Sequence, residues 1–202
     1  MRLEPYGDGA FLFRGLGHQE ASQLAEGLRA QAAVIDAVAA YGEVLVVGEP
    51  DLSNLSLGQG LRPALWTIPV CYELGPDLEE VAEALGCSVH DVVSAHSSTA
   101  YDCLAIGFCP GFPYLGPLPD AIAGLPRRAT PRVRVEPGSV AITGDQTAIY
   151  PAATPGGWHL IGLTPLEIVN EAAEYFPIRV GDQVRFVSIS EEEFSARMGQ
   201  RL

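Results

Sequence analysis

The sequence predicts an α+β protein built from a small ferredoxin-like α/β domain followed by a small β-barrel domain. Residues 1–75 alternate apolar, strand-like runs with helix-like segments in the order β-α-β-β-α-β, which is the order of the ferredoxin-like motif. Residues 76–98 have a helical pattern and are expected to join the two domains. Over residues 99–202, short apolar runs alternate with Gly and Pro turns, a pattern typical of a small barrel.

The elements of the first domain follow from the spacing of its apolar residues. Leu24 and Leu28 lie four residues apart among good helix formers, which predicts a helix. Two apolar runs flank Tyr41-Gly42, which predicts a hairpin. The expected elements are a strand over 10–13, a helix over 19–32, strands over 33–40 and 43–47, a short helix over 52–61 and a strand over 65–71.

The helical join is predicted from its start and stop signals. Pro76-Asp77 opens a first helix whose early turns carry glutamates, which suit the helix dipole, and Gly86 ends it. Ser88 can cap a second helix that runs through Ala95, and Asp91 completes a pair resembling a capping box.

The barrel domain is predicted from apolar runs between turn residues. Gly144-Asp145-Gln146 and Pro155-Gly156-Gly157 are typical turns, and each precedes an apolar run. We expect strands over 101–106, 138–143, 147–150, 158–163 and 184–189, and a surface helix over 191–198.

A stretch rich in proline and aromatic residues, Gly107–Pro119, interrupts the barrel pattern. Its proline density predicts neither a helix nor a central strand, but a stiff loop. Phe112 and Tyr114 flank Pro113, so an extended backbone would point both rings to the same side. Such a loop either plugs one end of the barrel or forms the wall of a binding cleft. The sequence leaves both possibilities open, and the nearby arginines favour the cleft wall.

Positive charge is concentrated in one short segment. Residues 1–126 hold 16 acidic residues against four arginines, and residues 135–202 hold nine against four, whereas residues 127–134 hold four arginines and no acid. Guanidinium groups match carboxylate and phosphate geometry, so the segment is a candidate anion site. The alternative is that these arginines pair with the protein's own carboxylates. We favour pairing for Arg132 and Arg134, and function for Arg127 and Arg128 beside the aromatic loop.

The composition excludes several classes of function. The chain of 202 residues contains no lysine, which excludes a Schiff base, a biotinyl-lysine and a P-loop lysine on this chain. A net charge of −13 argues against nucleic acid or an anionic membrane as partner. No apolar run is long enough to span a membrane, and the first residues lack the apolar stretch of a signal peptide. Four cysteines without paired spacing then suggest the reducing cytoplasm.

The titratable residues offer few candidates for catalysis. His96 ends the helical join and could act as a general base or proton donor, although a histidine at a helix C-terminus is equally well explained by the helix dipole. Cys109 lies in the stiff loop, where packing is favoured over a nucleophilic role. The histidine spacing predicts no metal site. We therefore take His96, Arg127 and Arg128 as the catalytic candidates.

Binding groups are more plentiful than catalytic ones. Hydroxyl, amide and aromatic side chains, together with glycine backbone, cluster around the loops of the barrel domain. This inventory predicts a site for a small anionic or amide-containing ligand, which a partner could share. The candidate binding residues are Phe108, Pro110, Gly111, Phe112, Tyr114, Arg132, Ser139, Gln146, Thr147, Tyr150, Gly156, Gly157 and Trp158.

Several long motifs in a fixed order resemble those of one family. The chain is similar to the KipI family, also called allophanate hydrolase subunit 1 or the PxpB component of 5-oxoprolinase, over nearly its whole length. The motifs are Pro69–Tyr72, Gly75–Leu78, His96, Gly107–Pro119, Pro126–Arg128, Thr130–Arg132, Pro137–Ile142, Gly144, Gln146-Thr147, Ile149–Pro151, Thr154–Trp158 and Ile161-Gly162.

The resemblance implies a fold and an activity. It implies a small α/β domain followed by a cyclophilin-like β-barrel, and a hetero-oligomer with a KipA-type subunit (PxpC) and a LamB/YcsF-type subunit (PxpA). Together such proteins use ATP to open 5-oxoproline, a small-molecule substrate, to glutamate. ATP would be a co-substrate of the complex, and no covalent cofactor is implied on this chain.

Two departures and two other functions accompany the resemblance. The family usually has an arginine where this chain has Leu163, and a small residue where it has Glu136. Relatives also include an inhibitor of a histidine kinase and the carboxyltransferase part of urea carboxylase. The three interpretations are therefore a 5-oxoprolinase component, which we favour and expect to be inactive alone, a kinase inhibitor, and a carboxyltransferase component.

Overall fold

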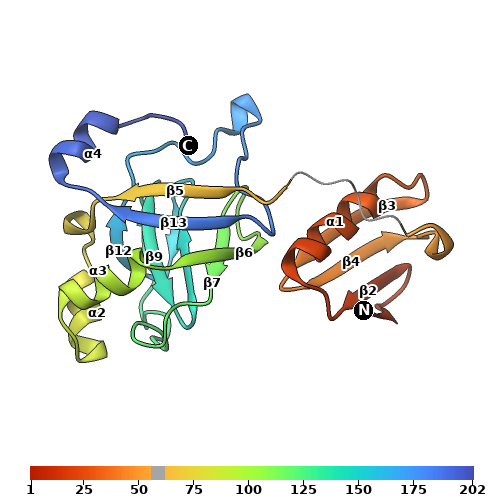
Figure 1. Ribbon diagram of the computed structural model, residues 1–202, viewed down its shortest axis with the longest axis horizontal. Coiled ribbons are helices and arrows are strands. Elements are labelled where there is room, and N and C mark those ends of the chain that lie inside the picture. Colours follow the sequence, from red (N-terminus) through yellow and green to blue (C-terminus); the bar gives the residue numbers. More distant parts are fainter. Residues whose placement is uncertain (56–61) are drawn as a thin grey trace.

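A computed structural model describes residues 1–55 and 62–202. Its two larger sheets have separate hydrophobic cores, one near the N-terminus and one in the remainder of the chain (Figure 1). The larger sheet curls into a nearly closed barrel. The predicted α+β class, with a small α/β part and a barrel, is confirmed.

The N-terminal part is a four-stranded antiparallel sheet with one helix. Its strands lie in the order β1-β2-β4-β3, and the β3–β4 turn holds Tyr41 and Gly42 at φ 51° and 74°, as expected of a tight hairpin. The elements are β1 (Arg2–Pro5), β2 (Ala10–Arg14), α1 (His18–Arg29), β3 (Val34–Ala40) and β4 (Glu43–Gly48).

Helix α1 covers one face of this sheet. Ala21, Leu24, Ala25 and Leu28 are buried on one side of the helix and pack against apolar residues of the strands. The helix begins where the Glu20 carboxylate accepts a hydrogen bond from the Gly17 N–H. The helix predicted from the spacing of Leu24 and Leu28 is confirmed, since both residues are buried on its inner face.

The order of elements in the N-terminal part differs from the ferredoxin-like prediction. Strand β1 lies at the sheet edge before the first predicted strand, and β5 (Leu65–Val70) joins the barrel by parallel pairing with β13 (Gln183–Ser188). Only Leu52–Asn54 of the helix predicted over 52–61 is a 3₁₀ turn, and the part over 56–61 lies outside the described residues. Pairing between segments so far apart leaves no trace in local apolar spacing. The limits of the two domains stay a prediction.

The barrel is a seven-stranded sheet in the order β12-β9-β10-β7-β6-β13-β5. A bridge between Cys71 and Leu163 links its first and last strands through backbone hydrogen bonds of 2.9 and 3.0 Å, which nearly closes the sheet. The remaining strands are β6 (Ala100–Ile106), β7 (Pro113–Gly116), β9 (Ser139–Thr143), β10 (Gln146–Ile149) and β12 (His159–Leu163).

Strand β7 corrects the prediction of a loop over Gly107–Pro119. It lies between β6 and β10, where a central strand was not expected. Pro113 is the first residue of the strand, a position where its missing N–H removes little from the hydrogen-bond ladder. Proline is therefore still excluded from the interior of this central strand, but the strand can begin at Pro113.

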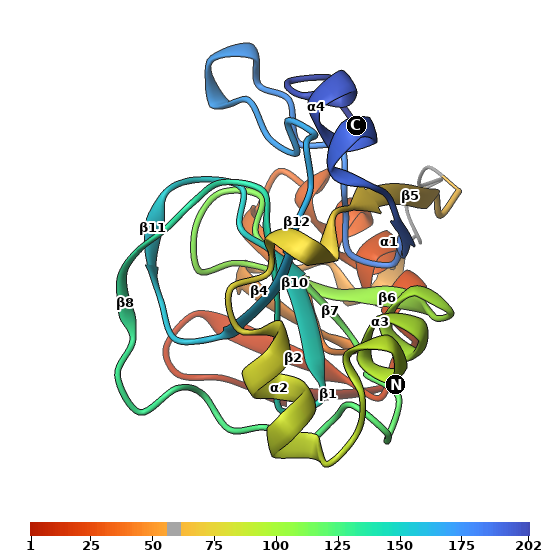
Figure 2. The same cartoon turned by 90° about the vertical axis from the view of Figure 1, so that its left-hand side faces the viewer.

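Two helices pack against the barrel at the end farther from the N-terminal part. They are α2 (Leu78–Leu85), which contacts β12, and α3 (Val89–Ser97), which contacts β13 (Figures 1 and 2). Their start and stop signals are confirmed, since Gly86 is left-handed and Ser88 forms a capping box with Asp91. Their predicted role as a join is wrong, because they cover the barrel and do not lie between the two parts.

The remaining elements lie outside the barrel wall. β8 (Arg132–Val135) and β11 (Thr154–Gly156) form a two-stranded ribbon beside it (Figure 2), and short 3₁₀ turns cover Tyr72–Leu74 and Glu171–Ala173. The predicted terminal helix is α4 (Glu191–Arg197). Within the described part of the chain, no helix has both the length and the apolar composition needed to cross a membrane.

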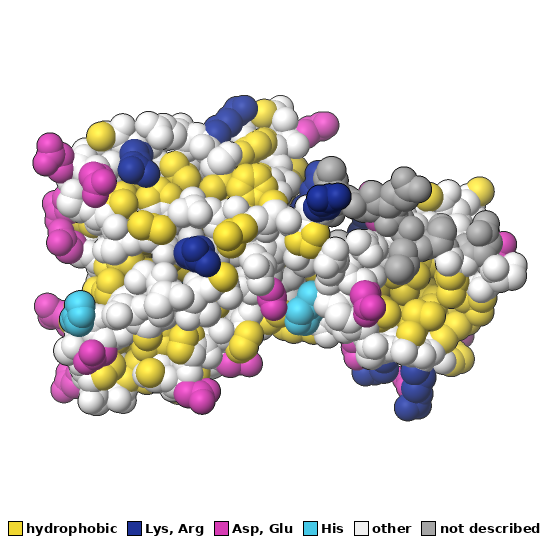
Figure 3. All heavy atoms as spheres, viewed as in Figure 1, with side chains coloured by type: hydrophobic (Ala, Val, Ile, Leu, Met, Phe, Trp, Pro, Cys, Tyr) yellow, Lys and Arg dark blue, Asp and Glu magenta, His cyan; other side chains and the backbone are white. Residues whose placement is uncertain are grey.

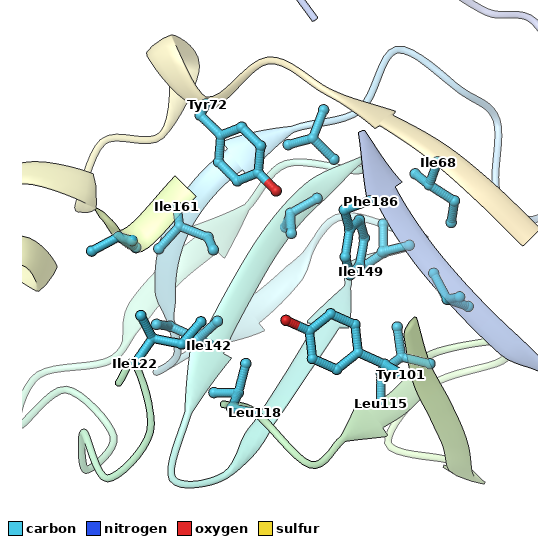
Figure 4. Packing of buried hydrophobic residues seen from close by; sticks show 14 of the residues in the cluster. Ile68, Tyr72, Tyr101, Leu115, Leu118, Ile122, Ile142, Ile149, Ile161 and Phe186 are labelled. Atoms are coloured by element: carbon cyan, nitrogen blue, oxygen red, sulfur yellow. The ribbon is translucent and has the colours of Figure 1, made fainter. Parts of the chain in front are cut away.

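The barrel interior is filled by aliphatic side chains and a few aromatic rings. Ile68, Ile142, Ile149 and Phe186 are buried in it. Figure 4 shows Tyr72 and Tyr101 with their hydroxyl groups directed into this interior. Buried hydroxyls require partners, and the residue that they contact is His96, described below.

Candidate functional site

A second apolar cluster lies on the outer face of the barrel sheet. Alternate residues of β9 and β10 point inward, and the small side chains of Ala141 and Ala148 between them point outward, which leaves room for large rings. We call the five rings placed there the aromatic cluster. Its members are Phe108, Phe112, Tyr114, Tyr150 and Trp158.

Phe112 is the centre of the aromatic cluster. Its ring centroid lies 5.0 Å from that of Tyr114, 5.2 Å from Tyr150 and 5.7 Å from Trp158, in edge-on arrangements that aromatic pairs prefer. The side chain is 2% exposed, so Phe112 is a packing residue. The expectation that Phe112 and Tyr114 point to the same side is confirmed, whereas the role of Phe112 as an exposed cleft wall is wrong.

Phe108 has the opposite character. It is 61% exposed, and its φ of 66° lies in the left-handed region, which costs a residue other than glycine about 1–2 kcal/mol. Its ring lies 5.3 Å from Phe112, at the solvent side of the aromatic cluster. Backbone strain that exposes an aromatic ring is typical of a functional position.

Glycines fix the loops that carry the rings. A β-carbon on Gly111 would overlap Val169, and one on Gly156 would overlap the Tyr150 hydroxyl. The Gly157 carbonyl accepts a hydrogen bond from the Arg128 N–H at 2.8 Å, whereas Pro110 is exposed in the turn before Gly111. The predicted glycines therefore shape the site through close packing.

A buried carboxylate organises the arginine segment 126–134, here called the arginine loop. Asp77, before the start of α2, is 1% exposed, and its Oδ1 accepts from Arg128 Nη1 at 3.0 Å and from Arg132 Nη2 at 2.6 Å. Its Oδ2 accepts from the Leu160 N–H at 2.7 Å. A buried charge of this kind is tolerated only when paired and fully hydrogen-bonded. Asp77 thus ties the arginine loop to α2 and β12.

The four arginines of the loop differ in whether they form ion pairs with the protein's own carboxylates. Arg128 also contacts Glu80 at 2.9 Å, and Arg134 pairs with Glu136 at 2.7 Å, so pairing, which we expected for Arg132 and Arg134, also applies to Arg128. Arg127 is exposed and forms no ion pair or hydrogen bond with the described residues. Of the arginines in this loop, Arg127 is the one whose whole guanidinium is unpaired among the described residues, whereas Arg128 and Arg132 are paired and keep the buried Nε and Nη1, respectively, without a partner.

Arg127 lies beside the aromatic cluster. Burial raises the pKa of Tyr114 and of Tyr150, and the positive charge of Arg127 opposes the shift at both phenols. The site therefore combines a free guanidinium, the exposed ring of Phe108 and the partly exposed ring of Tyr114 on one surface. Such a surface can hold a flat ligand that carries negative charge.

His96 lies in the barrel core and does not reach this surface. It is 0% exposed, stacks on Phe186 with centroids 4.5 Å apart, and bonds Tyr72 through Nδ1 at 2.7 Å and Thr147 through Nε2 at 2.9 Å. Burial lowers its pKa to about 3, so the ring is neutral near pH 7. This placement supports a structural role, and His96 is not part of the site proposed below.

Hydrogen-bond donors assign the His96 tautomer. Thr147 Oγ1 donates to the Ala141 carbonyl at 3.0 Å, so it accepts from Nε2–H of His96. Nδ1 is then bare and accepts from the Tyr72 hydroxyl. Thr147, a predicted binding residue, is 0% exposed and belongs to this buried network. The network satisfies both nitrogens of the ring.

Other predicted residues are scattered. Ser139 is buried at the start of β9, and Cys109 is half-buried with a pKa raised by burial. Gln146 donates to the Tyr41 hydroxyl at 2.9 Å and thereby links the barrel to the N-terminal hairpin. Leu163 packs against the buried cluster of Cys71, Ile189 and Phe194, so an apolar contact stands where the motifs predict an arginine. No group of three or more metal-ligating side chains occurs in residues 1–55 and 62–202.

Two residues were missed by sequence reasoning. Asp77 has the pattern of a helix-start residue, and only its position between two arginines in the folded chain shows its importance. Tyr41 has the pattern of a turn residue, yet its ring lies 6.4 Å from Tyr114. An arginine-rich segment in an acidic protein predicts that some acidic residue pairs with it. The sequence does not show which of the acidic residues that is.

Comparisons with known proteins identify the family of this chain and a solved structure of similar fold. A family model described as carboxyltransferase domain, subdomain C and D, matches residues 1–177. The chain therefore belongs to this family. Its fold is similar to that of a crystal structure of TTHA0988, with a TM-score of 0.79 and 36% identity, covering 90% of this chain and 40% of that one.

Relatives with an assigned activity share one name. The 5-oxoprolinase B subunit of Bacillus subtilis (strain 168) is 48% identical over 152 residues, which cover 73% of this chain and 62% of the relative. The protein of that name from Escherichia coli O157:H7 is 53% identical over 123 residues, covering 59% and 56%. The resemblance seen in the motifs is confirmed, and the chain spans somewhat more than half the length of these relatives.

Burial of neutral His96 predicts a loss of stability in acid. Because the folded pKa lies below the ordinary value of 6.5, the unfolded chain binds a proton that the folded chain cannot, and the unfolding free energy falls as pH drops from about 6.5 toward 3. The expected loss from His96 between about pH 7 and pH 5 is about 2 kcal/mol. Denaturant unfolding of wild type and His96→Gln at both pH values measures it. Equal pH slopes in the two proteins would contradict the assignment.

Alanine substitutions of Phe108 and Phe112, both in the segment Gly107–Pro119, should have different effects on stability. Phe112→Ala should lower the unfolding free energy by about 3–5 kcal/mol, because it opens a cavity in the buried cluster. Phe108→Ala, the matched control, should change it by less than about 0.5 kcal/mol, since its ring is exposed. Denaturant unfolding distinguishes them. Similar effects from both variants would show that the loop is packed differently.

Proposed function

We propose that this chain is the PxpB-type component of an ATP-dependent 5-oxoprolinase, a cyclic amide hydrolase that opens 5-oxoproline (pyroglutamate) to L-glutamate. The observation that carries the proposal is the 48% and 53% identity to relatives named as the B subunit of 5-oxoprolinase. Because the chain spans only part of those relatives, the activity, the substrate and the partners remain proposals for this chain.

The candidate site suits this substrate class. 5-Oxoproline is a flat five-membered lactam with one carboxylate. The exposed ring of Phe108 and the partly exposed ring of Tyr114 offer apolar faces for the lactam, and the free guanidinium of Arg127 offers a partner for the carboxylate or for charge that develops on the lactam oxygen. The clamp on Asp77 holds the loop in which Arg127 lies.

The chemistry explains the need for ATP. The lactam amide is stabilised by resonance, so the ring carbon is a poor electrophile. Phosphoryl transfer from ATP to the lactam oxygen would release ADP and activate that carbon. One water then adds as the ring C–N bond breaks and its nitrogen takes a proton, and a second water releases phosphate from the resulting acyl phosphate to give glutamate.

The candidate site supplies binding groups without a nucleophile and base. Cys109 packs against the aromatic cluster, but burial raises the pKa of its thiol and no hydrogen bond or ion pair joins it to a base among the described residues, and His96 is buried elsewhere. Further groups must therefore come from other chains, which we propose to be a KipA-type (PxpC) and a LamB/YcsF-type (PxpA) subunit in the cytoplasm. The word subunit in the relatives' names supports an assembly of this kind.

Arg127→Ala should lower kcat/KM of the assembled complex by about 10²–10³, the effect of removing a group that stabilises developing charge. The melting temperature should be unchanged, because Arg127 has no partner among the described residues. The measurement is ATP-dependent glutamate formation by this chain combined with both partner subunits. Arg185→Ala is the matched control, since Arg185 is likewise exposed and lies on β13.

The same assay tests the assignment as a whole. The three subunits together should form glutamate from 5-oxoproline, and this chain alone should form none. Activity that is unchanged in Arg127→Ala would remove Arg127 from the site. Failure of the three wild-type subunits to form glutamate, with carboxyl transfer to urea in its place, would favour the carboxyltransferase interpretation of the family.

A further inference from the structure

A cleft lies between the two parts of the molecule, and its lining residues differ from those of the aromatic cluster. Its volume is ≈ 580 Å³, within the range of about 300–1,000 Å³ typical of small-molecule sites. One wall comes from α1 and β3, and the other from residues 174–182 of the barrel. The surface view shows the two parts meeting at a narrow waist (Figure 3). None of the candidate residues described above lines this cleft.

The α1 wall is a polar stripe. Gln19, Ser22, Gln23 and Glu26 share one face of the helix, opposite the face that Leu24 and Leu28 bury in the N-terminal core. Ser22 and Gln23 are half-buried, and their side chains form no hydrogen bond with residues 1–55 or 62–202. Half-buried polar groups without protein partners are available to hydrogen-bond a polar ligand.

The opposite wall is rigid and presents a cation. The Asp182 carboxylate accepts from the Ala64 N–H at 2.9 Å, from Trp66 Nε1 at 3.0 Å and from the Arg179 N–H at 3.0 Å. The Gly181 N–H donates to the Cys103 carbonyl at 3.0 Å. The backbone of Arg179 is thus held in place, while its exposed guanidinium has no ion pair in the part of the chain that the structure describes.

The charges that remain available in the cleft are of both signs. Arg29 is occupied by the Ala37 carbonyl at 2.7 Å and by Asp36 at 3.6 Å, which leaves Arg179 as the cation for a ligand. Glu26 on α1 and Glu174 on the barrel side have no ion pair with the described residues. A polyanion would be repelled by these carboxylates, and an apolar ligand would leave the polar stripe unsatisfied.

We infer that the cleft binds a small zwitterionic amino acid. The ligand carboxylate pairs with the Arg179 guanidinium, its ammonium group lies against Glu26 of the same α1 stripe, and Ser22 and Gln23 hydrogen-bond the rest. The site is distinct from the arginine and aromatic surface, and the inference does not depend on the proposed activity. Since the walls belong to different parts of the chain, the ligand also bridges them.

Calorimetric titration of the isolated protein tests this site directly. The probes are L-glutamate and glutarate, which differ only in the α-ammonium group. We expect L-glutamate to bind and glutarate to bind at least about tenfold more weakly. Arg179→Gln and Glu26→Gln should each weaken L-glutamate binding by about tenfold or more, whereas Arg185→Gln, which removes an exposed arginine outside the cleft, should leave it unchanged.

Three results would overturn the inference. They are no binding of L-glutamate up to about 10 mM, equal binding of glutarate, and wild-type binding by the Arg179→Gln and Glu26→Gln variants. Because the titration uses this chain without partners or ATP, its outcome is independent of the assay for glutamate formation. Unchanged melting temperatures of the variants show that any loss of binding does not come from unfolding.

Discussion

The ion pairs of Asp77 with Arg128 and Arg132 are the interaction on which the candidate site depends. A carboxylate that is 1% exposed must be paired, and both arginines share its Oδ1 while Leu160 N–H holds Oδ2. These contacts join α2, the arginine loop and β12. Arg128 and Arg132 are thereby paired, and Arg127 stays unpaired beside the aromatic cluster. In this acidic protein, the buried carboxylate of Asp77 thus fixes the loop that presents the Arg127 guanidinium.

Much of the fold could be predicted from local signals. The helix limits at Gly86 and Ser88 and the turn at Tyr41-Gly42 depend on residues adjacent in sequence, and these predictions are confirmed. Long-range pairing could not be predicted in this way. The placement of β5 beside β13 depends on strands more than a hundred residues apart. Strand β7 is a central strand that begins at a proline, a position in such a strand that tolerates it, and the proline density of the segment concealed it.

The candidate site was predicted in composition and only partly in arrangement. The aromatic and arginine segments do meet, as their closeness in sequence suggests. Residues of one segment differ in burial, however. Phe112 is packed in the aromatic cluster while Phe108 is exposed, and Arg128 is paired with Asp77 while Arg127 is exposed. His96 and Thr147 are far from this surface because α3 and β10 direct them into the barrel. A sequence shows which groups can bind, but the sheet decides which side they face.

Native-state hydrogen exchange of Asp77→Asn tests the central claim that Asp77 fixes the arginine loop. The amides to follow are Arg128, which donates to the Gly157 carbonyl, and Leu160, which donates to Asp77. Both should exchange at least about tenfold faster in the variant, while Val46 in the N-terminal sheet is unchanged. Glu80→Gln, which removes only the exposed partner of Arg128, should exchange as wild type does. Wild-type protection of both amides in Asp77→Asn would contradict the account.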